Sequence, residues 1–78
     1  MIPLKRKYSF TSFEEAIAFI DRVAPIFSRA NHHPQITNFY NTVEFTYYTT
    51  SANNSVTELD HMIANEVEAI YQTQARQF

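Results

Sequence analysis

The stretch QITNFYNTVEFTYYTT, residues 35–50, decides the fold that the sequence predicts. Threonine, tyrosine and other strand-forming residues dominate it, and its second half alternates with a period of two. We predict two strands, Gln35–Tyr40 and Val43–Thr50, that form a hairpin turning near Asn41-Thr42. In the second strand the odd-numbered residues mark one face and the even-numbered residues the other.

A helix is predicted to begin at Phe13, upstream of this hairpin. Ser12 and Glu15 have the spacing of a capping box, in which the hydroxyl and the carboxylate each accept a hydrogen bond from a free backbone N–H. Apolar residues then recur at steps of four and three, which predicts one buried stripe. The stripe consists of Phe13, Ile17, Ile20, Ala24 and Phe27.

Two prolines bear on how this helix continues and where it ends. Pro25 lies inside the helix and has no N–H to donate, so we expect a kink or a break there. Pro34 forces His33 into an extended conformation, and the helix should therefore end at about Asn31.

The remaining elements complete an α+β pattern. The alternating segment Lys5–Phe10 predicts an edge strand, and Thr57 is expected to cap a last helix whose first turn is acidic. The buried stripe of that helix is predicted to be Leu59, Ile63, Val67 and Ile70, flanked by Met62 and Tyr71. In the polar loop Ser51–Ser55, Asn53 or Asn54 should adopt the left-handed conformation. The order strand, helix, strand, strand, helix predicts one domain over residues 1–78, a two-layer sandwich with both helices on one face of an antiparallel sheet.

The composition excludes several classes of protein. The 78 residues include no cysteine and no glycine, which removes disulfides, thiolate metal sites and glycine-rich phosphate loops. Six Lys and Arg against eight Asp and Glu give a net charge of −2, so no basic field attracts nucleic acid or an anionic membrane. No apolar run has the roughly 20 residues of a membrane span, and no signal peptide is recognisable, so a cytoplasmic location is expected.

Aromatic residues exceed what one small core needs. Five Tyr and seven Phe occur in a chain of which only 18% is charged. Since aromatic side chains are enriched at subunit interfaces, we expect a homo-oligomer, a dimer or a tetramer.

His32 and His33 form the one obvious titratable pair, and imidazole can serve as an acid or a base near neutrality. The alternative from the residues alone is structural: His32 would bond a loop carbonyl and His33 would be solvated. No spacing motif aligns His61 with them, so no metal site is predicted. Tyr47 and Tyr48 could stack on a planar ligand or pack in the core or at an interface.

The run Asn31–Pro34, followed by Asn38–Val43, closely resembles the signature of the pterin-4a-carbinolamine dehydratases. The resemblance extends over nearly the whole chain, from Tyr8-Ser9-Phe10 and the first helix to Thr57–Asp60. The family usually carries an additional N-terminal helix and outer strand, so the chain resembles a short form.

This resemblance implies dehydration of a 4a-hydroxytetrahydropterin to a quinonoid dihydropterin, as in tetrahydrobiopterin regeneration, without a metal or organic cofactor. His32 and His33 would be the catalytic acid and base at the substrate, and Pro34 would shape their loop. The opposite wall of the site would be formed by Thr49, Thr50, Ser51 and Ala52. Asp60 would occupy the position of the family's helix-start aspartate and contribute to substrate binding.

The family pattern is altered at several positions. Thr50 stands where active members carry a third histidine, and Ser28 stands where a charged or histidine side chain could orient the first imidazole. Ile36 replaces an aromatic residue, and Asn53–Ser55 replaces a loop that contains glycine. Two functions are therefore predicted: a dehydratase that uses His32 and His33, or a catalytically silent module that binds a pterin or a protein partner on the same fold.

Overall fold

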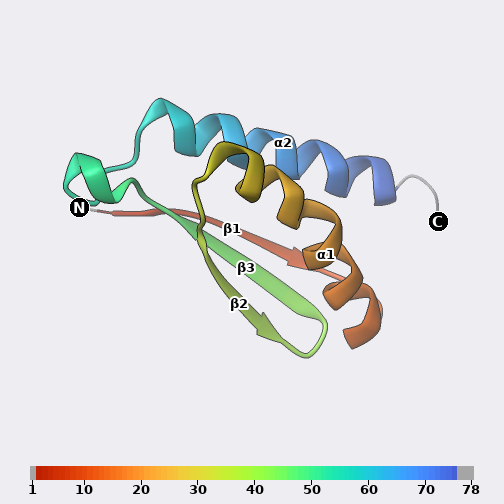
Figure 1. The fold of residues 1–78 in the computed structure, drawn as a ribbon. Helices are drawn as coiled ribbons and strands as arrows, with labels where there is room; N and C mark the ends of the chain where they lie inside the picture. Colours follow the sequence, from red (N-terminus) through yellow and green to blue (C-terminus); the bar gives the residue numbers. More distant parts are fainter. Residues whose placement is uncertain (1, 76–78) are drawn as a thin grey trace.

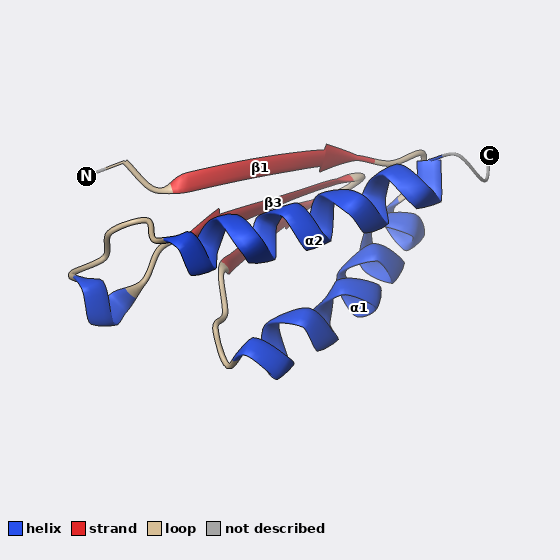
Figure 2. Ribbon diagram, turned by 90° about the horizontal axis from the view of Figure 1, so that it is seen from above, coloured by secondary structure: helices blue, strands red, loops and turns tan. Residues whose placement is uncertain are grey.

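A computed structural model describes residues 2–75 and has two layers (Figure 1). The elements, in chain order, are β1 Leu4–Ser9, α1 Phe13–Ala30, β2 Gln35–Phe39, β3 Thr42–Tyr47, the short 3₁₀ helix η1 Thr50–Ala52 and α2 Glu58–Ala75. The three strands form an antiparallel sheet in the order β1-β3-β2. Both helices lie on the same side of this sheet, as the view from above shows (Figure 2). The predicted α+β class and the order of elements are confirmed.

β3 is the central strand, and its inward face forms the middle of the core. Phe45 pairs with Arg6 of β1 on one side and with Ile36 of β2 on the other, so both outer strands are edges. Val43, Phe45 and Tyr47, which the alternation assigned to one face, are fully buried. The sequence could place these residues because a strand sends alternate side chains to opposite faces of the sheet.

The hairpin turn is displaced by one residue from its predicted position. Phe39 pairs with Thr42, so the two turn residues are Tyr40 and Asn41. Tyr40 has a φ of 50°, a region that bulky side chains seldom occupy. Hydrogen bonds brace the turn: the Thr42 hydroxyl donates to the Phe39 carbonyl at 2.9 Å, and the Phe10 N–H donates to the Asn41 carbonyl at 2.8 Å.

β3 also ends earlier than predicted, because the chain turns away after Tyr47. The Thr49 N–H donates to the Ser55 carbonyl at 2.8 Å, and the two residues form an isolated bridge that closes the loop containing η1. Asn53 and Asn54 both have left-handed backbones, with φ of 62° and 64°. Asparagine therefore supplies here the conformation that glycine usually provides.

The predicted buried stripe of α1 is wrong at Phe13 and Ile17, but Phe27 is buried as predicted and Ile20 packs against the core. Phe13 is 43% exposed and Ile17 36%, and the fully buried or nearly buried residues of this helix are Ala16, Phe19, Val23, Ile26 and Phe27. Apolar residues cover a wide arc of this helix, so a periodicity of three and four fits two adjacent stripes. Packing against the sheet buries the second of these stripes. In it, the Phe19 ring contacts the rings of Tyr8, Phe10, Phe45 and Tyr71.

The first turn of α1 is capped as the sequence predicted. The Ser12 hydroxyl accepts a hydrogen bond from the Glu15 N–H at 3.1 Å, and the Glu15 carboxylate accepts one from the Thr11 N–H at 3.3 Å. The helix runs unbroken through Pro25, so the predicted possibility of a break is wrong. Pro25 is exposed, and water can bond the Asp21 carbonyl that a proline nitrogen leaves without a donor.

In α2 the predicted stripe is correct in its middle and wrong at its start. Ile63 and Val67 are buried and Ile70 packs against the core, but Leu59 is 38% exposed. The buried position in the first turn belongs to Asp60 instead. Periodicity could not identify a buried carboxylate, because an ionised group enters a core only with partners from other elements.

Tyr47 provides a test of the core. Its hydroxyl is buried and has no hydrogen-bond partner among residues 2–75, and burial raises the pKa of this phenol. Because a buried polar group without a partner costs about 1–3 kcal/mol, we expect Tyr47→Phe to raise the free energy of unfolding by about 1 kcal/mol in urea denaturation.

Tyr71→Phe is the matched control, because the Tyr71 hydroxyl donates to the Ser9 carbonyl at 3.1 Å. This variant should lose stability or leave it unchanged. A loss of stability in Tyr47→Phe would contradict the expectation and reveal a partner for that hydroxyl.

Candidate functional site

Asp60 is the centre of the candidate site. It lies in the first turn of α2, has no exposed surface, and accepts hydrogen bonds from three other residues. His32 Nε2 lies 2.6 Å from Oδ1, and the Thr49 hydroxyl donates to Oδ2 at 2.7 Å. The Thr57 N–H also donates to Oδ2, at 2.9 Å. The carboxylate thus joins the α1–β2 loop, the end of β3 and the start of α2.

The backbone after α1 directs His32 toward Asp60. Asn31 adopts the left-handed conformation, with a φ of 48°, and its N–H donates to carbonyls of the last turn, Phe27 and Ser28. The His32 N–H also donates to the Phe27 carbonyl, at 3.1 Å. This C-terminal cap reverses the chain, and the extended conformation required before Pro34 then leads it into β2.

Thr57 completes the other side of the site. Its carbonyl accepts the first helical hydrogen bond of α2, from the His61 N–H, and its own N–H is satisfied by Asp60. Asp60 therefore acts as the third residue of a capping box as well as a partner of His32. The Thr57 and Thr49 hydroxyls lie 2.8 Å apart, which holds the end of β3 against this cap.

The environment keeps Asp60 ionised. Burial alone would raise the pKa of its carboxyl, but the hydrogen bonds from His32, the Thr57 N–H and Thr49, and the charge of His32, hold that pKa below its ordinary value. The His32 side chain is only 14% exposed. A carboxylate on Nε2 fixes the ring and its tautomer, so that Nδ1 is the nitrogen available to accept a proton.

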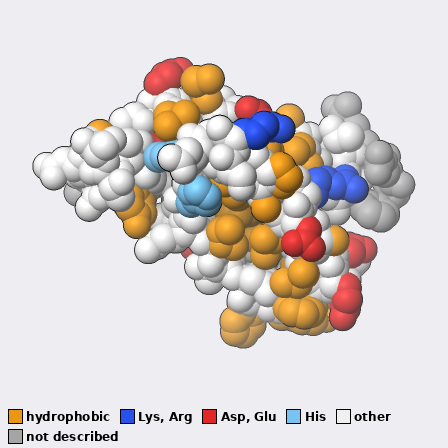
Figure 3. Space-filling model, in the orientation of Figure 1, with side chains coloured by type: hydrophobic (Ala, Val, Ile, Leu, Met, Phe, Trp, Pro, Cys, Tyr) orange, Lys and Arg blue, Asp and Glu red, His pale blue; other side chains and the backbone are white. Residues whose placement is uncertain are grey.

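The other predicted site residues lie at different depths. His33 is exposed and Pro34 is half-buried. In η1, Thr50 and Ser51 are exposed and Ala52 is half-buried. Thr49 is half-buried. Among the four residues of the predicted wall, it is the one whose side chain bonds Asp60. Figure 3 shows histidine side chains at the surface beside a run of apolar side chains.

Two residues have a position other than the one predicted from the sequence. Asp60 has no surface open to a substrate, so its contact is with His32. Ser28 is exposed, and the hydrogen bond that orients His32 comes from Asp60. The spacing Thr57-x-x-Asp60 is the one signal that could have pointed to this carboxylate as a cap, but only the tertiary structure brings it to His32.

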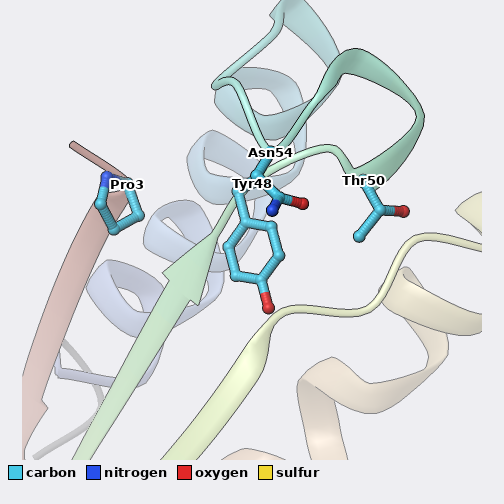
Figure 4. A pocket seen from close by; sticks show the side chains of 4 residues that line it. All are labelled: Pro3, Tyr48, Thr50 and Asn54. Carbon is cyan, nitrogen blue, oxygen red and sulfur yellow. The ribbon is translucent and has the colours of Figure 1, made fainter. Parts of the chain in front are cut away.

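An open cavity of about 260 Å³ lies at the junction of β3 and η1 (Figure 4). It is lined by Pro3, Tyr48, Thr50 and Asn54. Sequence reasoning named Thr50 as a wall of the site and did not connect Asn54 with it. The lining combines an aromatic ring, a hydroxyl and an amide, which suits a flat ligand with a polar edge.

Over residues 2–75, no group of three or more His, Asp or Glu side chains is arranged to hold a metal ion. In the same part of the chain, no helix has both the length and the apolar character needed to cross a bilayer.

Together, these observations define an α+β sandwich in which a histidine–carboxylate pair joins the loop after α1 to the start of α2. A family model described as pterin 4 alpha carbinolamine dehydratase matches residues 2–70. The chain belongs to this family, and the resemblance inferred from its motifs is confirmed.

Individual relatives agree with this assignment. The chain is 39% identical over 66 residues to a protein of Chelativorans sp. (strain BNC1), and 42% identical over 64 residues to one of Thermomicrobium roseum; both are named "Putative pterin-4-alpha-carbinolamine dehydratase". These alignments cover 85% and 82% of this chain but 66% and 68% of the relatives, so the chain spans about two thirds of their length.

A solved structure has the same fold. The crystal structure of a transcriptional coactivator/pterin dehydratase from Brucella melitensis superposes with a TM-score of 0.81 at 36% sequence identity. The match covers 88% of this chain and 72% of that one.

The Asp60 carboxylate should make stability depend on acid pH. Because its pKa is lowered in the folded state, its contribution is complete above the ordinary value of 3.8 and is lost as the pH falls through the folded value. We expect Asp60→Asn to lower the free energy of unfolding at pH 7 by about 1–3 kcal/mol. The difference from wild type should shrink toward pH 3 in urea denaturation. A difference that grows on acidification would contradict a lowered pKa.

Proposed function

We propose that this protein dehydrates a 4a-hydroxytetrahydropterin to a quinonoid dihydropterin by acid–base catalysis. The observation that carries the proposal is the hydrogen bond of 2.6 Å between His32 and the buried Asp60. A buried carboxylate that fixes an imidazole and stabilises its protonated form is the arrangement that a general base needs. Family membership supports a pterin carbinolamine as the substrate.

The two histidines would divide the proton transfers between them. His32 Nδ1 would accept the proton from the pterin ring nitrogen, and the Asp60 carboxylate would stabilise the imidazolium that forms. The electron pair of that N–H bond forms the new C=N bond as the C–O bond to the 4a-hydroxyl breaks. His33, which is exposed and can exchange protons with solvent, would protonate the leaving hydroxyl so that it departs as water.

Thr50 limits the rate that this site can reach. Thr50 is exposed at the start of η1, at the position where the family pattern has a third histidine. Its hydroxyl is not an acid or a base near pH 7. A positioned acid or base contributes about 10²–10⁴-fold, so the loss of one slows the reaction without ending it.

A non-catalytic role is the second candidate, and one observation favours it. Edge strand β2 and its turn expose large apolar side chains: Phe39 is 80% exposed, Tyr40 63% and Ile36 43%. The same surface supports the homo-oligomer expected from the aromatic content. Sedimentation of the protein at micromolar concentration tests the oligomer, which a strictly monomeric chain would contradict.

The catalytic roles are tested by the dehydration rate of chemically generated 4a-hydroxytetrahydropterin, followed by ultraviolet absorbance. We expect His32→Ala and His33→Ala each to lower kcat by about 10²-fold or more. Asp60→Asn should also lower kcat, because its neutral amide cannot stabilise the imidazolium of His32. His61→Ala is the control, because this histidine is exposed on α2 and has no role in the proposed site. A wild-type rate equal to the uncatalysed one would favour the non-catalytic role.

Restoring a third histidine tests the account of Thr50. We expect Thr50→His to raise kcat by at least about tenfold, since it adds a group that titrates near neutrality. Ser51→His, one residue further along the exposed η1, is the matched control and should change kcat little. Equal rates in the two variants would show that position 50 does not face the reacting atoms.

A further inference from the structure

The two edges of the sheet differ in charge. Edge strand β2 contains no charged residue, whereas β1 contains Lys5, Arg6 and Lys7, three of the six Lys and Arg in the chain. All three side chains are exposed. Within residues 2–75 none of them forms a salt bridge, although Glu44 of β3 lies opposite Lys7. β1 is therefore a basic edge in a chain whose net charge is −2.

Among the described residues, the outer side of β1 carries no strand. The sheet order β1-β3-β2 pairs β1 with β3 alone. In the view from above, β1 forms the margin of the molecule, and no described element lies beyond it on the side away from β3 (Figure 2). An edge strand presents a row of N–H and C=O groups with which another extended chain can pair. The six residues of β1 are long enough to accept one such strand.

Two hydrogen bonds from side chains indicate which residues of β1 direct their backbone groups to this open edge. The Lys5 carbonyl accepts a hydrogen bond from Arg6 Nη1 at 2.9 Å, and the Ser9 carbonyl accepts one from the Tyr71 hydroxyl at 3.1 Å. Successive residues of an antiparallel strand direct their N–H and C=O groups to opposite sides, so Lys7 faces the same edge as these two. No side chain within residues 2–75 bonds the backbone of Lys7.

Lys5 and Lys7 also share a side-chain direction. Both lie on the face of the sheet opposite to that of Tyr8, which is buried beneath the helices. Residues directly opposite one another in an antiparallel pair have their side chains on the same face. An incoming strand would therefore place two of its residues, separated by one, beside the two ammonium groups. Carboxylates at these two positions would be complementary to them.

The same charges disfavour a second copy of this chain as the occupant. Antiparallel pairing of two β1 strands about Arg6 would place Lys5 opposite a second copy's Lys7, and Arg6 opposite its equivalent. Like charges directly opposite one another destabilise a sheet, and lysine on an edge strand commonly prevents such self-pairing. An acidic strand would meet attraction at the same edge.

We propose that β1 is a docking edge for an acidic, extended segment of a partner protein, which adds antiparallel to the sheet with carboxylates at alternate positions beside Lys5 and Lys7. Backbone hydrogen bonds would hold the strand, and the two lysines would select its sequence. Arg6 would release the Lys5 carbonyl to an N–H of the incoming strand. This interaction is separate from the proposed dehydration, because the His32–Asp60 pair joins other segments of the chain.

Fluorescence anisotropy with a labelled peptide of alternating Glu and Thr residues tests the charge contacts on the full chain. We expect Lys5→Gln/Lys7→Gln to raise the Kd about fivefold, because it removes two exposed ion pairs with the peptide. Arg22→Gln/Arg29→Gln is the matched control, since it removes the same two charges from exposed positions of α1, and its Kd should stay close to that of wild type. An equal rise in both double variants would overturn the proposal.

N-methylation of the peptide tests backbone pairing, because it removes N–H groups and leaves the charge unchanged. The Glu residues would lie opposite the edge-facing Lys5 and Lys7, so their N–H groups point to β1. We expect N-methylation at Glu to raise the Kd at least about tenfold, and N-methylation at Thr to leave it nearly unchanged.

Two results of these measurements would contradict strand addition. Equal Kd values for the two methylated peptides would show that charge alone attracts the ligand, as it would an oligonucleotide. Competition between peptide binding and self-association of the chain in sedimentation would assign the edge to a second copy. Either result overturns the docking edge and leaves the proposed dehydration unaffected.

Discussion

The buried carboxylate of Asp60 is the constraint on which the rest of this small structure depends. An ionised group without exposed surface costs several kcal/mol unless hydrogen bonds replace its water. The chain provides these from three separate segments: His32 after α1, Thr49 after β3 and Thr57 before α2. Folding to satisfy one carboxylate therefore places the α1–β2 loop, the end of the central strand and the last helix in one arrangement.

This arrangement gives the two adjacent histidines different properties. His32 is largely buried and fixed through Nε2, whereas His33 is exposed. In the proposed dehydration, the fixed imidazole would act as the base and the exposed one as the acid. Thr50, at the position where the family pattern has a third histidine, lines the cavity with a hydroxyl instead of an imidazole.

The small size of the chain also explains why some apolar side chains remain exposed on its outer surfaces. A short chain with one sheet and two helices on a single face leaves apolar side chains on edge strand β2 and at the start of α1. Such chains bury only about 60% of their unfolded surface, so aromatic residues remain exposed even when the core is complete. Phe39 and Tyr40 at the hairpin, and Phe13 on α1, are the result.

The sequence by itself determined the elements and their order. Alternation along β3 separated its two faces, the Ser12 and Glu15 spacing identified the start of α1, and the His32-His33-Pro34 run indicated the family, because each signal lies within a few neighbouring residues. Only the tertiary structure decided which of two apolar stripes of α1 is buried, that Asp60 instead of Leu59 occupies the inner position of α2, and that Tyr48 and Asn54 share a cavity. These outcomes depend on contacts between segments far apart in the chain, and a local sequence pattern does not determine which distant residue a side chain contacts.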